Sequence, residues 1–336
     1  MKTLFKLFVL LVLVAAGWVG YGLLLPTRPQ NEMFVLLRPG WTTRRIATEL
    51  KNAGVIRDSN AFLLWHYITR PRSLKAGEYR FDHAASALQV HERIAAGDIF
   101  KHTVVIPEGY NMFDIAAAIE AAGLGTRDEF LKVARASTAL VSDIDPEAES
   151  LEGYLFPDTY QFTRTQTMAD IAAMMVKRFR QEARAIGLLK ASNSPEPNRT
   201  NVRRIVTMAS IVEKETAAPE ERPTVAGVYY NRLARKMSLD ADPSVIYAAL
   251  LAGKYRGAIF RSDLNANSPY NTYRNPGLPP GPIGNPGRAS LEAAMRPAQT
   301  DFLFFVSDAN GHHRFARTLD EHSRNVAAYR RAVSGR

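Results

Sequence analysis

Two carboxylates at the end of one apolar segment are the strongest candidates for chemistry in this sequence. The segment 207–212 is followed by Glu213, Lys214 and Glu215. On a helix, residues two apart point about 200° apart, so the two carboxylates cannot share one site. One can face a cleft while the other is solvated beside Lys214. A glutamate desolvated at the end of a buried helix has a raised pKa and can act as a general acid. Helical geometry does not choose between Glu213 and Glu215, and an ordinary charged helix end remains the alternative.

Composition excludes most other chemistry. The chain has no cysteine, which excludes a thiolate nucleophile, a disulfide scaffold and a cysteine-bound metal. Its seven histidines form no HExxH motif, and neither a GxSxG elbow nor a phosphate-binding loop is present. The net charge of +10 comes from scattered basic residues without a nucleic-acid-binding motif. We therefore expect proton transfer by carboxylates, no metal or cofactor and no nucleic acid. An acidic polymer fits the charge better.

Several ungapped segments carry a resemblance to a known family. Residues 208–216 resemble the signature of the endolytic murein transglycosylases, the YceG-like family. The match continues in the same order over nearly the whole chain, in segments 152–160, 221–222, 225–233, 242–247, 268–273 and 277–283. Several motifs in the right order make the resemblance specific.

The resemblance implies a reaction and a catalytic residue. It identifies the second glutamate of the Glu-Lys-Glu-Thr run, Glu215, as the catalytic acid. The enzyme would cleave the MurNAc–GlcNAc β-1,4 bond within nascent peptidoglycan strands and leave 1,6-anhydro-MurNAc ends, which terminates glycan elongation. Because the sugar's own C6 hydroxyl attacks, one carboxyl can serve both proton transfers without a cofactor. The implied partners are peptidoglycan strands, the inner membrane and peptidoglycan synthases of the elongation machinery.

Polar residues in the matching motifs are candidates for substrate binding. Tyr270, Asn271 and Tyr273 lie on a loop rich in groups that bond to and stack on sugars, although turn formation also explains them. Asp242 and Asn231 are further candidates. Asp242 precedes a proline and therefore also fits a helix N-cap.

Two other functions stay open. A hydrolytic muramidase would need a second carboxylate near Glu215, for which Asp242 and Asp158 are the candidates. A non-catalytic protein that binds or organises the cell wall would need no such group.

The N-terminus predicts a membrane anchor. Residues 7–25 carry no charge and are about long enough to cross the hydrocarbon core. Lys2 and Lys6 precede them, so the positive-inside rule leaves residues 1–6 in the cytoplasm and exports the rest. This predicts a single-pass inner-membrane protein with a periplasmic catalytic domain. A cleavable signal peptide, cut near Ala15-Ala16-Gly17, is the alternative.

A repeat at an offset of 69 residues defines the region 33–123. Gly40 corresponds to Gly109, and each predicts a strand, a glycine turn and a helix. With the strand and helix expected at 76–81 and 86–96, the region resembles a LysM carbohydrate-binding module, with Trp41 or Tyr79 as sugar platforms. A generic packing module is the alternative.

Residues 124–336 are expected to form the catalytic domain. Helical patterns dominate, and two short apolar segments flank Asn310-Gly311, the favoured type I′ hairpin dipeptide. The predicted fold class is α+β: a transmembrane helix, a small LysM-like module, and a mostly helical catalytic domain with a C-terminal β-hairpin.

Overall fold

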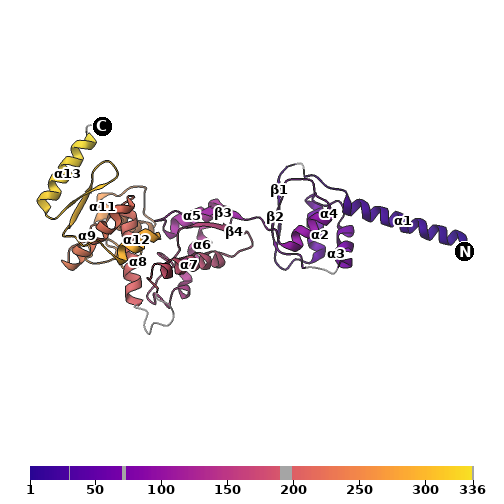
Figure 1. Ribbon diagram of the computed structural model, residues 1–336, viewed down its shortest axis with the longest axis horizontal. Coiled ribbons are helices and arrows are strands. Elements are labelled where there is room, and N and C mark those ends of the chain that lie inside the picture. The colour runs from indigo at the N-terminus through magenta and orange to yellow at the C-terminus, as the bar shows by residue number, and fades with distance from the viewer. Residues whose placement is uncertain (30, 70–72, 190–198, 335–336) are drawn as a thin grey trace. The chain divides into compact units, whose positions relative to one another are not determined.

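The computed structural model describes residues 1–29, 31–69, 73–189 and 199–334 (Figure 1). The predicted α+β class is confirmed: helices dominate, and the strands of the described residues form three two-stranded sheets. The chain divides into two compact units. The first comprises Met1–Thr103 and Gln161–Thr167, and the second comprises Val104–Tyr160 and Met168–Arg336.

Helix α1 (Lys2–Leu24) contains most of the predicted membrane span. Within the described part of the chain, it is the helix that is long and apolar enough to cross a membrane, with a mean hydropathy of 2.4. Most of its side chains are exposed, but Gly22 and Leu23 are buried. They pack on the rest of the first unit, where α1 contacts α3 (Ser59–Ile68) and α4 (Ala87–Ala96).

The rest of the first unit contains the strand and the helix expected at 76–81 and 86–96, whereas α3 is a helix that was not expected from the sequence. Strand β1 (Met33–Leu37) pairs antiparallel with β2 (Gly77–Phe81), and α2 (Thr43–Asn52) and α3 lie between them in the chain. The two strands and the three helices close over one apolar core, which includes Leu37, Leu50, Phe62 and Ile94.

The proposal that Tyr79 is a sugar platform is wrong. Tyr79 is fully buried in this core, and its hydroxyl donates to the carbonyl of Lys75 at 2.8 Å. Tyr79 and Phe81 of β2 both belong to the apolar core of this unit. Trp41 remains partly exposed, with the Arg45 guanidinium 4.4 Å from its ring centroid.

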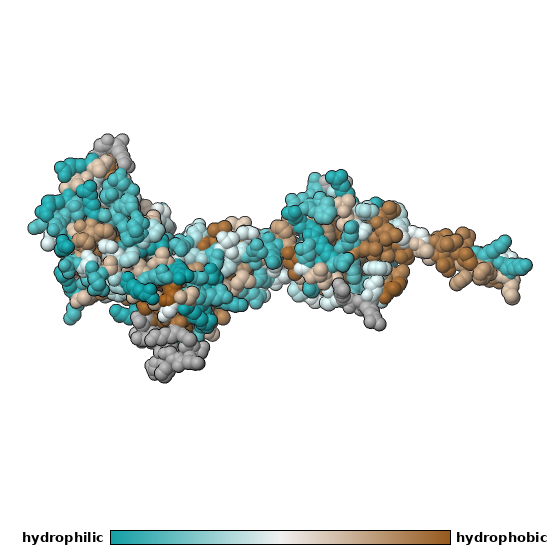
Figure 2. Space-filling model, viewed as in Figure 1, coloured by the Kyte–Doolittle hydropathy of each residue, from teal (hydrophilic) through white to brown (hydrophobic). Residues whose placement is uncertain are grey.

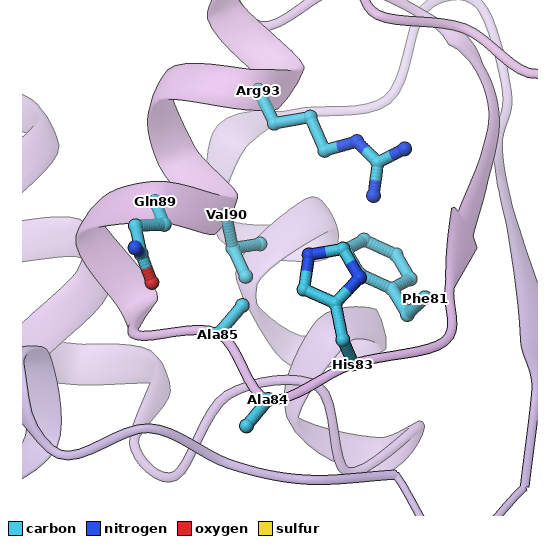
Figure 3. A pocket seen from close by; sticks show the side chains of 7 residues that line it. All are labelled: Phe81, His83, Ala84, Ala85, Gln89, Val90 and Arg93. Carbon is cyan, nitrogen blue, oxygen red and sulfur yellow. The ribbon is translucent and has the colours of Figure 1, made fainter.

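A small pocket lies between the end of β2 and α4 (Figure 3). Its volume of about 130 Å³ is below the roughly 300–1,000 Å³ typical of ligand pockets. Arg93, which borders it, already donates to Asp98 and to the carbonyl of Arg80. The pocket is lined by Phe81, His83, Ala84, Ala85, Gln89, Val90 and Arg93. The pocket is thus too small for a typical ligand, and the guanidinium that borders it is already hydrogen-bonded within the protein.

The repeat is confirmed as local structure, and its halves fall in different units. Gly40 and Gly109 adopt left-handed conformations, with φ of +81° and +78°, which side chains disfavour. Each is followed by a ten-residue helix, α2 in the first unit and α5 (Met112–Ala121) in the second.

The second unit is built mainly from helices. Strand β3 (His102–Val105) and strand β4 (Thr159–Phe162), in which the chain passes from one unit to the other, pair with each other; β4 lies in a region expected to be mostly helical. Helix α8 (Arg199–Glu215) packs against α9 (Arg222–Ala234), α10 (Asp242–Leu251) and α12 (Arg288–Met295). The remaining helices are α6 (Arg127–Ala136), η1 (Thr138–Leu140), α7 (Met168–Ala185), η2 (Pro219–Glu221), α11 (Arg261–Leu264) and α13 (Leu319–Ser334).

The C-terminal strands pair as predicted, but the turn between them differs. Strands β5 (Phe304–Ser307) and β6 (His313–Ala316) are antiparallel, and Ser307 pairs with His313, so five residues connect them. Positive φ occurs at Ala309 and Gly311, which excludes a two-residue type I′ turn. The Asp308 carboxylate accepts from the N–H groups of Asn310 and His312 and thereby stabilises the longer loop.

Candidate active site

Glu215 is the last residue of α8, where the buried part of the helix ends. Ile211 and Val212 are fully buried in the preceding turn, whereas Glu215 is half-buried. Thr216 ends the helix, and its hydroxyl accepts from the Ala218 N–H at 3.1 Å. The apolar pattern of α8 thus fixes the helix, and the turn after it leaves one carboxyl at the boundary between core and surface.

The surroundings of Glu215 favour its neutral form. Burial is the largest cause that raises its pKa, to about 7, and the nearby Asp242 carboxylate adds to the rise. The hydroxyl of Tyr229, from α9, donates a hydrogen bond to Glu215 and acts in the opposite direction, as does Arg232. At neutral pH an appreciable fraction of Glu215 therefore carries a proton.

Arg232 lies near Glu215, but its donors are used elsewhere. Its Nε donates to the carbonyl of Leu303 at 2.7 Å, and Nη1 donates to the carbonyl of Leu239 at 2.9 Å and to Asp240 at 3.1 Å. None of the described basic side chains forms an ion pair with Glu215. Its charged form consequently lacks the partner that would hold the pKa low.

Glu213 has a different environment from the one expected. It is not solvated beside Lys214: its side chain is 4% exposed and accepts from Arg222 at 2.7 Å. Its other oxygen accepts from the N–H of Gly287 at 2.8 Å. Glu213 is therefore a buried ion-pair partner that joins α8 to α9 and to the loop before α12. The expected solvation failed because these elements, distant in sequence, cover that side of the helix.

Asp242 and Tyr273 lie beside Glu215. Electrostatic coupling links both side chains to Glu215, and the Tyr273 hydroxyl donates to Asp242 at 2.7 Å. Both residues are exposed. The expected N-cap role of Asp242 is wrong: α10 is capped by Ala241, Asp242 is already helical, and its carboxylate makes no capping bond. That carboxylate instead faces the tyrosine of the loop.

The side chains of the other three motif residues, Tyr270, Asn271 and Asn231, contact neighbouring parts of the protein. The Asn271 side chain is fully buried and donates to the carbonyls of Leu264, the last residue of α11, and of Ala266 in the loop that follows. The Asn231 amide donates to the carbonyls of Thr300 and Phe302 and so joins α9 to the segment before β5. Tyr270 is half-buried, with its ring 5.2 Å from that of Tyr247. These contacts hold loops in place, while Asp242 and Tyr273 present polar groups to solvent.

Glu152 was not singled out from the sequence beyond its place in a matching motif. It is 2% exposed and accepts from the Met112 N–H, the Asn285 amide and the Tyr247 hydroxyl. Burial raises its pKa to about 7, and these donors oppose the rise. The residue joins the start of α5, helix α10 and the Pro/Gly-rich loop before α12. A glutamate within the apolar segment 151–156 is the signal that could have identified it.

The arrangement supports proton transfer. It offers a carboxyl that is partly protonated at neutral pH, a tyrosine that orients it, and an exposed carboxylate–tyrosine pair next to it. Within residues 1–29, 31–69, 73–189 and 199–334, no group of three or more His, Asp or Glu side chains is placed to hold a metal ion.

The pH dependence of the reaction should follow Glu215. If the protonated carboxyl starts the reaction, kcat/KM falls as pH rises through about 7. Tyr229→Phe removes a hydrogen bond that lowers the Glu215 pKa, so the falling limb should move to higher pH. Profiles of kcat/KM between pH 5 and 9 for both proteins would measure this. An unchanged limb in the Phe variant would show that the limb does not report Glu215.

The comparisons with known proteins agree with the motifs. The YceG-like family profile matches residues 35–328. An endolytic murein transglycosylase of Bacillus subtilis (strain 168) is 31% identical over 95% of this chain and 91% of its own length. One of Streptococcus pneumoniae (strain D39) is 30% identical over 95% of this chain, which spans 63% of that protein. The crystal structure of a YceG-like protein from Listeria monocytogenes superposes with a TM-score of 0.56 at 31% identity, covering 88% of this chain and 99% of that one. With a profile match over most of its length and a relative matched nearly end to end, this chain belongs to the YceG-like family.

Proposed function

We propose that this protein is an endolytic murein transglycosylase with Glu215 as its acid and base. The observation that carries the proposal is the placement of Glu215: a carboxyl whose pKa is raised to about 7, oriented by Tyr229 and free of an ion pair with any described basic residue. The names of the Bacillus and Streptococcus relatives support the substrate class.

The proposed reaction needs one carboxyl. Protonated Glu215 donates its proton to the glycosidic oxygen between MurNAc and GlcNAc, and the bond from that oxygen to C1 of MurNAc breaks. The carboxylate then accepts the proton of the MurNAc C6 hydroxyl as its oxygen bonds to C1. The products are a shortened strand ending in 1,6-anhydro-MurNAc and a strand beginning with GlcNAc. No water is consumed, and the carboxyl returns to its protonated state.

The neighbouring residues are assigned by their exposure. Asp242 and Tyr273 are exposed beside Glu215, so we assign them to substrate contacts. Tyr270 is assigned a peripheral contact because it is only half-buried. We assign Asn271 and Asn231 an indirect role, because their side-chain amides are hydrogen-bonded to backbone carbonyls and position the loops near the site.

A hydrolytic muramidase remains the second candidate because Asp242 lies near Glu215. Two carboxyl groups about 5–9.5 Å apart are the usual requirement for hydrolysis, either by direct attack or through water. Against this assignment, the Tyr273 hydroxyl is bonded to Asp242. Asp158, the other candidate partner, is paired with Arg178.

Helix α1 supports the proposed location. Its apolar length and the two lysines in its first turns, Lys2 and Lys6, favour a single-pass inner-membrane protein with the N-terminus in the cytoplasm and the catalytic unit in the periplasm. In that position the enzyme would act on strands as peptidoglycan synthases extend them.

The size of the products tests endolytic cleavage. Purified protein, incubated with long uncrosslinked glycan strands, should give strands of intermediate length from the earliest time points. Chromatographic separation by length would measure the distribution. Release of disaccharides alone would show exolytic cleavage, and unchanged strands would favour a non-catalytic role in the cell wall.

A further inference from the structure

Helix α3 presents an apolar face to solvent. Leu64, Tyr67 and Ile68 are 42%, 64% and 67% exposed, and their spacing places them on one side of the helix. The opposite side, which carries Phe62 and His66, is buried in the core of the first unit. Exposed apolar side chains that gather on one surface mark an interaction site. We call these three residues the α3 apolar face.

The C-terminal end of α1 packs against α3, the helix that bears this face. Leu23 is only 6% exposed and belongs to the core that contains Phe62. At Gly22, an added Cβ would lie 2.8 Å from the Cβ of Ala61, so the helices approach closely because a glycine stands there. The end of α1 therefore packs directly on α3 and does not stand free of the first unit.

Arg57, just before α3, fastens the chain that leaves α1. Its guanidinium donates to the carbonyls of Leu25 and Pro26 and lies 5.3 Å from the Tyr21 ring centroid. The direction of α1 relative to α3 is therefore fixed by packing and by hydrogen bonds together.

The length of α1 sets the depth at which α3 would lie. A hydrocarbon core of about 30 Å requires about 20 helical residues, and α1 has 23. A span of that length reaches the turn that packs on α3. Trp18 and Tyr21, exposed in the last two turns, are the residue types found where a helix leaves the hydrocarbon.

We propose that the α3 apolar face lies in the outer surface of the bilayer that α1 crosses and holds the first unit against the membrane. Figure 2 shows apolar side chains on this unit at the end that α1 joins. The proposal rests on α1 being an uncleaved anchor. The occupant is lipid because α1, the proposed span, packs directly on α3, and the exposed Leu24 and Leu25 stand at the end of that span.

The absence of cysteine makes a direct test possible. Full-length Leu64→Cys and Ile68→Cys proteins would carry a nitroxide label in liposomes of phosphatidylethanolamine and phosphatidylglycerol. Phe34→Cys is the matched control: Phe34 is 45% exposed, and its strand β1 lies at the other end of the unit from α1 (Figure 1). The ratio of oxygen to nickel-chelate accessibility should be severalfold higher at positions 64 and 68 than at 34.

Each alternative outcome is distinguishable. Equal ratios at the three positions, in protein that resists alkaline extraction, would overturn the proposal and leave the anchor intact. Release by alkaline extraction, or a mature chain starting near residue 18, would remove the anchor and the proposal with it, while the catalytic assignment would stand. Spin–spin broadening between labels at position 64, together with protection from nickel, would identify a second copy of this chain as the occupant and overturn the proposal.

Discussion

Glu215→Gln should lower the rate of glycan cleavage by about 10²–10⁴-fold or more, because the loss affects both proton transfers. Glutamine keeps the shape of the side chain and can still accept the Tyr229 hydrogen bond, but it cannot donate the proton that starts the reaction. Turnover of purified strands at pH 6 would measure the loss. Glu220→Gln, the same change at a glutamate whose side chain is 66% exposed, should retain full activity.

Although Glu215→Gln should lower activity, the same substitution should raise the stability of the folded protein above neutral pH. Folding raises the pKa of this carboxyl from 4.5 to about 7. The free energy of unfolding therefore decreases as pH rises between those two values. Neutral glutamine avoids that loss. Glu215→Gln should therefore unfold at a higher temperature than the wild type at pH 8, with no gain at pH 4.5. A variant that is inactive because it is unfolded would show the reverse and would not support the assignment.

Glu213→Gln should damage the fold more than the chemistry. It leaves Arg222, whose side chain is 9% exposed, without its partner at 2.7 Å. Breaking a buried pair from one side costs roughly 3–5 kcal/mol, and the lower end applies because Glu108 remains 3.4 Å from Arg222. Urea unfolding would measure the free-energy change, while kcat of the folded fraction should stay within about tenfold of the wild type.

A double variant separates the ion pair from catalysis. Glu213→Gln combined with Arg222→Met removes both charges and should recover part of the stability lost in the single variant, because no unpaired charge remains buried. Should Glu213→Gln prove stable but inactive while Glu215→Gln turns over normally, the roles assigned to the two glutamates are reversed.

Local patterns predicted the elements of the fold well. Glycine turns at Gly40 and Gly109, the ten-residue helices after them and the apolar helix that ends at Glu215 all follow from sequence periodicity. The hairpin turn was less predictable, because a single side chain, Asp308, supplies the acceptors that favour a longer loop over the turn typical of Asn310-Gly311.

The site was predictable only as far as one helix. Periodicity located two glutamates on α8, but their difference depends on partners distant in the chain. Arg222 forms an ion pair with Glu213 and the Gly287 N–H donates to it, whereas the Tyr229 hydroxyl donates to Glu215. The family motif, not the helix pattern, selected Glu215. Burial on β2 likewise decided that Tyr79 is a core residue, which alternation alone does not reveal.

The end group of the product tests the central claim most directly. Cleavage of purified glycan strands in ¹⁸O-labelled water, followed by mass spectrometry, reports whether water or the C6 hydroxyl attacked C1. Attack by the C6 hydroxyl predicts 1,6-anhydro-MurNAc ends without ¹⁸O, in the wild type and equally in the residual activity of Asp242→Asn. Reducing MurNAc ends that carry ¹⁸O, lost together with activity in Asp242→Asn, would contradict the single-carboxyl account and identify a hydrolase.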